Sequence, residues 1–500
     1  MKTSFDLIDL FYISPIIVLF LVSLVPILSK VLNGNKEPSS FFSVFIPVCG
    51  GLAAAVLSVG ASLYIMGDPN IKSSPLAFSG ALIMDGIALW TSFLVSIILC
   101  VIILISKENP YTKGKQFSEY IFLLVNSAVG MMIVAWSNDL IVTFIGIEVM
   151  SLCLYILIAL SNETRHSKEA SIKYFILGSF ASAIFLYGIA LMYGTIGTTY
   201  IHEIVQGARE IISINRVFLI GTGMVALGFA FKVSLFPFFN WTPDVYQGSG
   251  TPLTTFMATG VKVVSFVAFL RFMTTDILGG VHSEAFITTL QWMAVLTIIV
   301  GNVAAILQDD LKRILAYSSV AHSGYLLIGV IVAGADGGQS IGASGVVFYL
   351  FAYAIMTLGA FAVVSVLEKD TDTPIKVDDL KGMSSRHPLL ALAMCVFMLS
   401  LAGIPPTLGF FGKFYLFSAA IAEGFFWLAV WGVVGSVISV YYYLRPLVVM
   451  YMSDEAGAGI VDRTPATRFA IVIMALLVIL IGLASEPFYM QMQASVLSLY

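Results

Sequence analysis

The chain of 500 residues is 59% hydrophobic and only 11% charged, and its mean hydropathy is +0.97. Soluble globular domains carry about 25% charged residues, so this composition excludes a soluble protein and indicates one that spans a membrane. The formal net charge of −4 is too small to favour nucleic acid as a partner.

The apolar runs are long and continuous, as in residues 121–136 and 469–484. Strands of a membrane barrel would alternate apolar and polar residues, whereas a spanning helix needs about 20 mostly apolar residues. The four cysteines lie apart within apolar runs, and no Cys/His pair has the spacing of a metal site. The sequence therefore predicts an all-α polytopic membrane protein without a bound metal.

In chain order the apolar runs predict about fourteen transmembrane helices. They lie at residues 11–32, 41–66, 83–106, 118–137, 140–160, 170–195, 216–240, 252–272, 287–307, 314–334, 341–367, 388–421, 425–450 and 467–486. The seventh and the twelfth contain internal proline, and the twelfth is too long for one crossing. Because proline removes a helical hydrogen bond, we expect helices 7 and 12 to be broken.

The basic residues predict the orientation. With both termini outside, fifteen of the 25 Lys and Arg fall in inner loops and five in outer segments. Inner loops of membrane proteins carry an excess of Lys and Arg, so this bias favours N- and C-termini on the outer side.

Charges within the spans indicate transport. Lys173, Lys232, Lys262 and Lys413 lie within predicted spans, while Glu148 is the one clear mid-span carboxylate. A charge at the bilayer centre costs about 2.5–3.5 kcal/mol, and one glutamate cannot neutralise four lysines. The alternative is purely structural pairing. We favour a proton or cation path in a hydrated interior.

Polar residues share helix faces at the right spacing for such a lining. Three faces are predicted: Glu148, Ser151 and Tyr155; Thr255, Thr259, Lys262 and Ser265; and Ser318, His322 and Tyr325. His322 is expected to be a relay group because histidine titrates near neutrality.

Other charged groups are expected at the periphery. Asp85 and Asp139 lie near span ends and can reach the membrane interface. The charged loop 368–387 and the tail with Met490 and Met492 should face solvent or a partner.

Each predicted break lies near a lysine. Pro237 follows Lys232, and Pro405-Pro406 precedes Lys413. A freed backbone group at membrane depth must face protein or water, so both sites predict a small polar cavity. Lys413 lies five spans after Lys232. Because five is an odd number, similar units around the two lysines would cross the membrane in opposite directions. The predicted divisions are a three-helix segment (1–115), two inverted five-helix repeats (116–274 and 275–452), and a C-terminal helix with a tail (453–500).

Three longer motifs carry a resemblance. The sequences "FKVSLFPFFNWTPDVYQG", "DDLKRILAYSSVAHSGYLLIGV" and "LSLAGIPPTLGFFGKFYLF" closely resemble the antiporter-like membrane subunits of respiratory complex I, most of all the subunit N group of bacterial NADH–quinone oxidoreductase. The chain departs from the family pattern at Phe239, where histidine is usual, and at Val261, where serine is common. A proton path through that histidine is not expected here.

The resemblance implies a role for each matching position. The implied proton-transfer residues are Glu148 on the fifth span paired with Lys232 on the seventh, Lys262 on the eighth linking two half-channels, His322 as a central relay, Lys413 on the twelfth at the exit, and Lys173 on the sixth.

The resemblance implies a proton-translocating subunit of an enzyme complex, in a bacterial inner membrane and in a hetero-oligomer with other membrane subunits of complex I. It implies no cofactor in this chain, with NADH, FMN, iron–sulfur clusters and quinone bound by partner subunits. The alternatives are a subunit of a multisubunit Na+/H+ antiporter or membrane-bound hydrogenase, and a scaffold that has lost transport.

Overall fold

The computed structural model describes residues 7–67, 76–112, 116–160, 165–204, 216–274, 284–335, 341–370, 373–453 and 465–497. These residues are mostly helical. The strands in these ranges form one small hairpin, in which β1 (Leu76–Ala77) pairs antiparallel with β2 (Leu82–Ile83) around the 3-10 turn η2 (Phe78–Gly80).

Twelve helices of the described residues are long and apolar enough to span a membrane, which confirms a polytopic helical membrane protein. They are α2 (Ser14–Leu32), η1 with α3 (Phe41–Phe45, Ile46–Gly67), α4 (Gly86–Ser106), α5 (Phe117–Trp136), α6 (Leu140–Leu160), α7 (Arg165–Ile196), the continuous α11, η3 and α12 (Thr251–Phe256, Met257–Val261, Lys262–Thr274), α13 (Glu284–Ile306), α14 (Leu311–Ala335), α15 (Ile341–Leu367), α19 (Phe426–Met452) and α20 (Pro465–Leu483). They match twelve of the fourteen expected spans.

The other two expected spans, which contain Pro237 and Pro405-Pro406, are both interrupted, whereas Pro26 in α2 and Pro446 in α19 lie inside continuous helices. In the seventh, α9 (Arg216–Lys232) ends before Pro237, and α10 (Trp241–Gly248) follows it. The twelfth divides into α17 (Pro388–Ala402) and α18 (Leu408–Ala422) on either side of Pro405-Pro406. Both breaks are confirmed, while the count of fourteen and the inverted repeats stay predictions.

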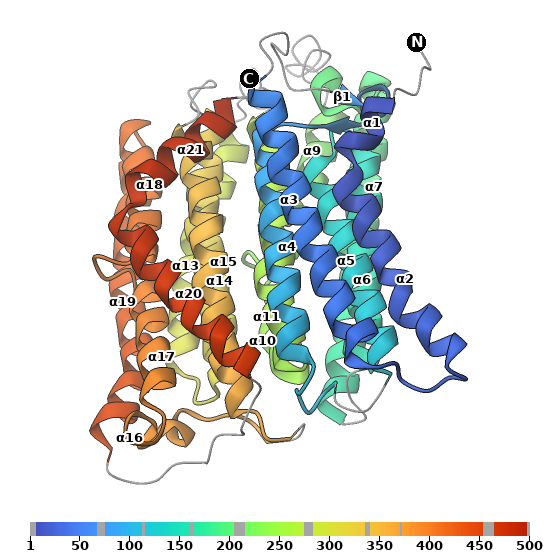
Figure 1. Cartoon of the computed structure of the whole chain (residues 1–500). Coiled ribbons are helices and arrows are strands. Elements are labelled where there is room, and N and C mark those ends of the chain that lie inside the picture. Colours follow the sequence, from blue (N-terminus) through green and yellow to red (C-terminus); the bar gives the residue numbers. More distant parts are fainter. Residues whose placement is uncertain are drawn as a thin grey trace.

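The short elements lie at the ends of the bundle or on its side. They are α1 (Leu7–Tyr12), η4 (Val377–Leu380), α16 (Met383–Arg386) and α21 (Ser485–Leu497). In Figure 1, α1 and α21 lie toward the same end of the bundle, and α16 lies at the opposite end.

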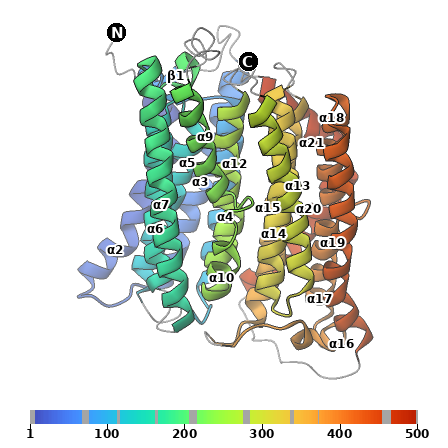
Figure 2. The ribbon, with the colours of Figure 1, turned by 180° about the vertical axis from the view of Figure 1, so that it is seen from behind.

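The N-terminal and C-terminal halves of the chain form two groups of upright helices side by side (Figures 1 and 2). In the most apolar 18 residues of each helix, all residues are buried in 251–274 and 94% in α14 and α15, but only 22% in α2. In a membrane protein such exposed apolar surface faces lipid or a partner. The three buried helices place the core, and with it most of the candidate site, at the junction of the halves.

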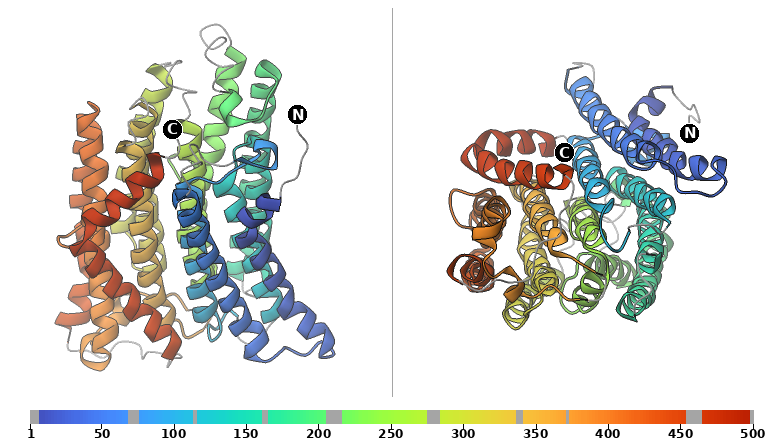
Figure 3. Two further views of the ribbon diagram at one scale, coloured as in Figure 1. Left: turned by 45° about the horizontal axis from the view of Figure 1, so that its top comes forward. Right: turned by 60° about the horizontal axis from the view of Figure 1, so that its bottom comes forward.

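The helices α20 and α21 lie together along one side of the bundle, as the end-on view in Figure 3 shows. The expectation that both methionines of the tail face solvent or a partner is wrong for Met492, which is 1% exposed, while Met490 is 56% exposed. The described part of this tail is therefore packed helix.

Candidate functional site

The break between α17 and α18 supplies the hydrogen-bond partners of Lys413. The Lys413 Nζ donates to the carbonyl oxygens of Leu401 and Ala402, each at 3.0 Å, and to Ser436 Oγ at 2.9 Å. The two carbonyls belong to the last turn of α17, which ends at Gly403 with a φ of +85°. The broken helix thus supplies acceptors to a buried ammonium group directly, whereas the small polar cavity expected there stays a prediction.

Lys262 begins α12 at the end of the short π-helix η3 and is 2% exposed. Its Nζ donates to both the carbonyl oxygen and the Oγ of Ser319 on α14, each at 2.5 Å. The same Oγ accepts a hydrogen bond from the Tyr353 hydroxyl of α15 at 2.9 Å. Lys262 is therefore held by two oxygens of Ser319, and Tyr353 in turn holds the Ser319 hydroxyl.

His322 lies on α14, one turn after Ser319, and is 1% exposed. Its Nδ1 shares a hydrogen bond with the Tyr349 hydroxyl at 2.5 Å, and its Nε2 shares one with the Tyr443 hydroxyl at 2.9 Å. The Tyr443 hydroxyl also hydrogen-bonds Ser318 Oγ. A neutral imidazole donates through one nitrogen and accepts through the other, so His322 links two hydroxyls as a relay requires.

Aromatic contacts join these three groups into one line. The Tyr353 ring lies 5.1 Å from the His322 ring, and the Tyr325 ring meets His322 edge-on at 5.6 Å, centroid to centroid. The Lys413 Nζ lies 5.1 Å from the centroid of the Tyr325 ring. Lys262, His322 and Lys413 are thus connected through shared neighbours.

Lys232 is the last residue of α9, is 4% exposed, and donates to Ser151 Oγ on α6 at 2.7 Å. Ser151 lies one turn from Glu148, whose Oε1 accepts a hydrogen bond from the Ser182 hydroxyl of α7. The resemblance implies a direct Glu148–Lys232 pair, but among the described residues no ion pair joins the two. Glu148 and Lys232 instead flank one serine.

Two buried tyrosines lie beside Lys232. The rings of Tyr155 and Tyr174 have centroids 5.9 and 6.0 Å from its Nζ, within cation–π range. Neither hydroxyl has a hydrogen-bond partner in the described structure. The surroundings of Lys232 are thus more aromatic and less fully hydrogen-bonded than those of Lys413.

Lys173 does not share this environment. It forms ion pairs with Glu169 at 2.7 Å and with Asp244 at 2.9 Å, and its side chain is 40% exposed. Arg313 contacts the other oxygen of Asp244 at 3.0 Å. Burial acts to raise the pKa of the Asp244 carboxyl, but hydrogen bonds from Lys173 and Arg313 outweigh it and hold that pKa below its usual value. Lys173 therefore does not depend on Glu148 for a counter-charge, because it has two carboxylate partners of its own.

Two carboxylates expected at the periphery are buried. Asp85 is 1% exposed and binds Arg271 through both oxygens, at 2.5 and 2.6 Å. Glu368 is 2% exposed and pairs with Lys312 at 3.1 Å. The surface position expected for Glu368 is wrong, because its carboxylate turns inward to Lys312, and Asp85, at the start of α4, likewise turns inward to Arg271. Asp139 is also mostly buried, and its Oδ1 accepts from the backbone nitrogens of Ile141 and Val142 at the start of α6.

After these pairs are set aside, Lys232, Lys262 and Lys413 remain buried without a carboxylate partner in the described part of the chain. Each is held by neutral oxygen atoms, which accept hydrogen bonds from an ammonium group but do not cancel its charge. Such groups are able to exchange protons, because a lysine side chain can exist as an ammonium or as a neutral amine.

The sequence did not reveal the oxygens that hold these groups, namely Ser182, Ser319, Tyr349, Tyr353, Ser436 and Tyr443. Tyrosines four residues apart within the apolar run 341–367 were the available signal, since Tyr349 and Tyr353 share one helix face. Within the described residues, no group of three or more His, Cys, Asp or Glu side chains could hold a metal ion.

Comparison with known proteins adds independent evidence. Residues 137–439 match the family described as NADH:quinone oxidoreductase/Mrp antiporter, transmembrane. The chain is similar to NADH-quinone oxidoreductase subunit N of Bdellovibrio bacteriovorus, with 52% identity over 99% of this chain and 100% of the relative. It is 36% identical to the protein of the same name from Chloroflexus aggregans, over 98% of each chain.

Solved structures are similar as well. A chain of respiratory complex I from Thermus thermophilus superposes with a TM-score of 0.79 at 30% identity, covering 95% of this chain and 98% of that one. A chain of the Mrp complex from Dietzia superposes with a TM-score of 0.84 at 20% identity, covering 99% and 98%. At that lower identity the second likeness shows the fold alone.

Proposed function

Because the chain belongs to the transmembrane family of NADH:quinone oxidoreductase and Mrp antiporter subunits, we propose that it is a subunit N that translocates protons within a bacterial NADH–quinone oxidoreductase. The observation that carries the proposal is the set of three buried lysines held by neutral oxygens, two of them joined through His322. A scaffold would gain stability from apolar residues at these positions.

The proposed proton route has two sections. The first holds Glu148 and Lys232 around Ser151, and the second runs from Lys262 past His322 to Lys413. Protons enter the second section at Lys262 and leave from Lys413, whose partners lie at the helix break. The first section lies in the proposed repeat at 116–274, and the second begins there at Lys262 and continues into the proposed repeat at 275–452.

Glu148 acts as the switch of the first section. A carboxylate and an ammonium about 4 Å apart attract by about 4 kcal/mol at an effective dielectric of about 20. Since the two groups flank Ser151 without touching, a small movement of α6 toward α9 would add this contact and hold the proton on Lys232. Withdrawal of Glu148 removes the attraction and releases the proton toward Lys262.

The remaining parts of the enzyme belong to partners. NADH, FMN, the iron–sulfur clusters and quinone bind to other subunits, and this chain couples quinone reduction to proton movement. The chain lies in the inner membrane with both termini on the outer side. Lys173, half-exposed on α7 and paired with Asp244, is proposed to take part at the contact with a neighbouring membrane subunit rather than in the central line.

Replacement of Glu148 by Gln tests this function. The amide keeps the shape and can still accept from Ser182, but it carries no charge to hold the proton of Lys232. We expect the complex to assemble and its NADH-driven proton uptake into proteoliposomes to fall about 10²-fold. Unaltered uptake by an assembled complex would refute the switch.

The second candidate is a subunit of a Na+/H+ antiporter, which the fold shared with the Mrp complex favours. The higher identity to subunit N relatives over the whole chain argues for the first candidate. Sodium-dependent proton exchange in vesicles without NADH would decide for the antiporter.

A further inference from the structure

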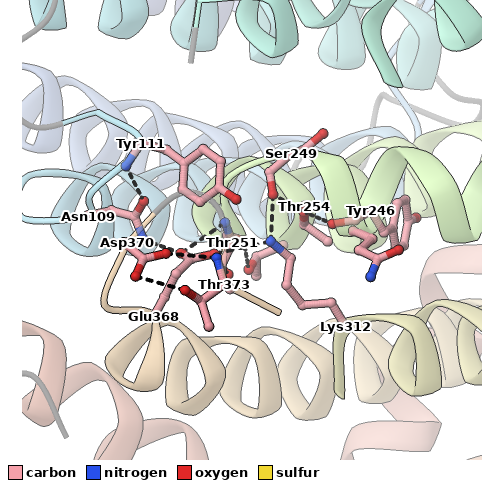
Figure 4. A network of polar contacts seen from close by, with 12 residues as sticks. Asn109, Tyr111, Tyr246, Ser249, Thr251, Thr254, Lys312, Glu368, Asp370 and Thr373 are labelled. Atoms are coloured by element: carbon pink, nitrogen blue, oxygen red, sulfur yellow. Dashed lines mark hydrogen bonds and ion pairs between the residues drawn. The ribbon is translucent and has the colours of Figure 1, made fainter. Parts of the chain in front are cut away.

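A cluster of buried polar residues lies at the end of the bundle where α14 begins and α15 ends. The Glu368 carboxylate accepts hydrogen bonds from Asn109 Nδ2 at 2.6 Å and from Thr251 Oγ1 at 2.7 Å, and it pairs with Lys312 Nζ at 3.1 Å. Figure 4 shows the side chains of Glu368 and Lys312 converging on one point beside Thr251. Lys312 also donates to the carbonyl oxygen of Ser249 at 2.6 Å.

This cluster differs from the other ion pairs of the described residues because it is buried and both of its charged partners can exchange a proton. Lys312 and Glu368 are 4% and 2% exposed, and both partners can hold or release a proton. The buried pair of Asp85 and Arg271 cannot do so, because arginine does not give up its proton in proteins. The pair of Lys173 and Asp244 lies in a half-exposed position.

Two helices connect the cluster to Lys262. Thr251 begins the continuous helix that carries Lys262, eleven residues or roughly 16 Å further along. Lys312 lies on α14 seven residues, or roughly 10 Å, before Ser319, which accepts the hydrogen bond from Lys262. Both ends of the Lys262–Ser319 contact are thus attached to elements that meet at Glu368.

A row of hydroxyls follows the first of these helices. Thr251, Thr255 and Thr259 lie one turn apart and are fully buried, and the next buried polar residue on the helix is Lys262. The hydroxyl of Thr255 donates to the carbonyl of Thr251 at 2.6 Å, and that of Thr259 donates to the carbonyl of Thr255 at 2.7 Å. The lone pairs of each hydroxyl oxygen stay available to accept a hydrogen bond from a further donor.

From these observations we propose that Lys312 and Glu368 form a second proton-exchange site, which takes protons from the aqueous side at this end of the bundle and passes them along the threonine row to Lys262. The inference rests on the proposed function, because it needs Lys262 to carry protons.

In each proposed cycle, the Lys312–Glu368 pair takes up one proton, releases one proton and returns to its starting state. In the resting state Lys312 is an ammonium and Glu368 a carboxylate, so the pair is neutral overall. A proton arriving from water binds Glu368 and leaves Lys312 buried without its counter-charge, which is costly. Lys312 then releases its proton toward Lys262, and the proton on Glu368 moves to Lys312 and restores the ion pair. One proton enters and one leaves.

The variant Lys312→Arg separates proton exchange from structural pairing. Arginine keeps the positive charge and the ion pair with Glu368 but cannot release a proton. In the reconstituted complex we expect normal assembly and an approximately 10²-fold slower NADH-driven proton uptake, normalised to assembled complex. The matched control is Arg271→Lys, an exchange of the same two residue types in the other buried pair, with uptake per complex unchanged.

The double variant Glu368→Gln with Lys312→Met covers the case in which arginine does not fit. It removes both charges together and leaves no unpaired ion. We expect it to assemble and to pump as slowly as Lys312→Arg. Wild-type uptake by either assembled variant would overturn the proposal and make the pair a structural clamp.

The same assay distinguishes this proposal from the function on which it rests. Lys262→Met is measured in parallel. If Lys262→Met stops uptake while the Lys312 and Glu368 variants pump normally, only the second site is refuted. If Lys262→Met also pumps normally, the proposed function fails.

Discussion

The two broken helices of this chain each carry a buried lysine, but they treat it differently. At the break between α17 and α18, the freed carbonyls of Leu401 and Ala402 accept from Lys413 directly. At the break between α9 and α10, Lys232 donates to Ser151 on a separate helix, while backbone groups near the break bind the side chains of Trp241 and Thr297.

This difference separates a fixed site from an adjustable one. The partners of Lys413 belong to the backbone that flanks it, so its surroundings change only if the break itself changes. The partner of Lys232 is one turn from Glu148 on α6, so its surroundings depend on how α6 sits against α9. The break between α9 and α10 therefore suits a switch, and the break between α17 and α18 suits an exit site of constant proton affinity.

The largest expected effect is from Lys413→Ala. The carbonyls of Leu401 and Ala402 lose their donor, and the line that begins at Lys262 loses its last proton carrier. We expect proton uptake by the assembled complex to fall about 10²-fold or more. Lys369→Ala, which removes an exposed lysine, is the control and should pump normally. Normal uptake by the Lys413→Ala complex would remove the exit site from the route.

A matched pair of serine substitutions compares the two lysines directly. Ser151→Ala removes the one side-chain oxygen that accepts from Lys232 in the described structure, whereas Ser436→Ala leaves Lys413 with two carbonyls. Leaving a buried donor unsatisfied costs about 1–3 kcal/mol. We therefore expect Ser151→Ala to slow proton uptake roughly tenfold and Ser436→Ala to change it less than about threefold. Equal effects would contradict the distinction between an adjustable and a fixed site.

A matched pair of glycine substitutions tests the packing of Lys413 against its break. Gly403 and Gly424 have φ angles of +85° and +81°, so alanine is strained at both by about 1–2 kcal/mol. A Cβ at Gly403 would lie 3.0 Å from Lys413 Cδ and 3.2 Å from its Nζ, but one at Gly424 would meet nothing within 4 Å. Thermal unfolding of the purified complex should show a larger loss of stability for Gly403→Ala, and only that variant should slow proton uptake. Identical behaviour of the two would mean that Lys413 does not depend on the break.

The smallest expected effect concerns the first break. Trp241 Nε1 donates to the carbonyl oxygen of Phe231 at 3.2 Å, and its ring stacks on Tyr174 with centroids 4.7 Å apart. Trp241→Phe keeps the stacking and removes the hydrogen bond, which should cost about 0.5–1.5 kcal/mol of stability. The exposed Trp292 provides the control, since Trp292→Phe should leave the unfolding temperature unchanged. A loss of transport with unchanged stability in Trp241→Phe would show that Trp241 serves the lysine rather than the break.

Much of the fold follows from the sequence because its signals are local. Long apolar runs require helices in a bilayer, and Pro237 and Pro405-Pro406 interrupt the two helices in which they lie. The lysines at positions 232, 262 and 413 stand out because a charge in an apolar run is costly. These features need no knowledge of the partners in space.

The pairing of charges could not be predicted, because a residue near the end of a span can turn to water or to another helix. Glu368 and Lys312 are 56 residues apart, and Lys173 and Asp244 are 71 apart, so no spacing rule connects them. The Ser319 oxygens that hold Lys262 likewise reach it through the packing of α14 against α12, which neither segment of the sequence shows by itself.

The central claim is that protons cross this chain through its buried lysines, and the most direct test is proton uptake by the Lys262→Met complex. Initial NADH-driven acidification of proteoliposomes is measured per assembled complex, with NADH oxidation followed in the same sample. The account predicts that uptake falls about 10²-fold although the complex assembles. Uptake at the wild-type rate, in a complex of wild-type composition, would contradict it.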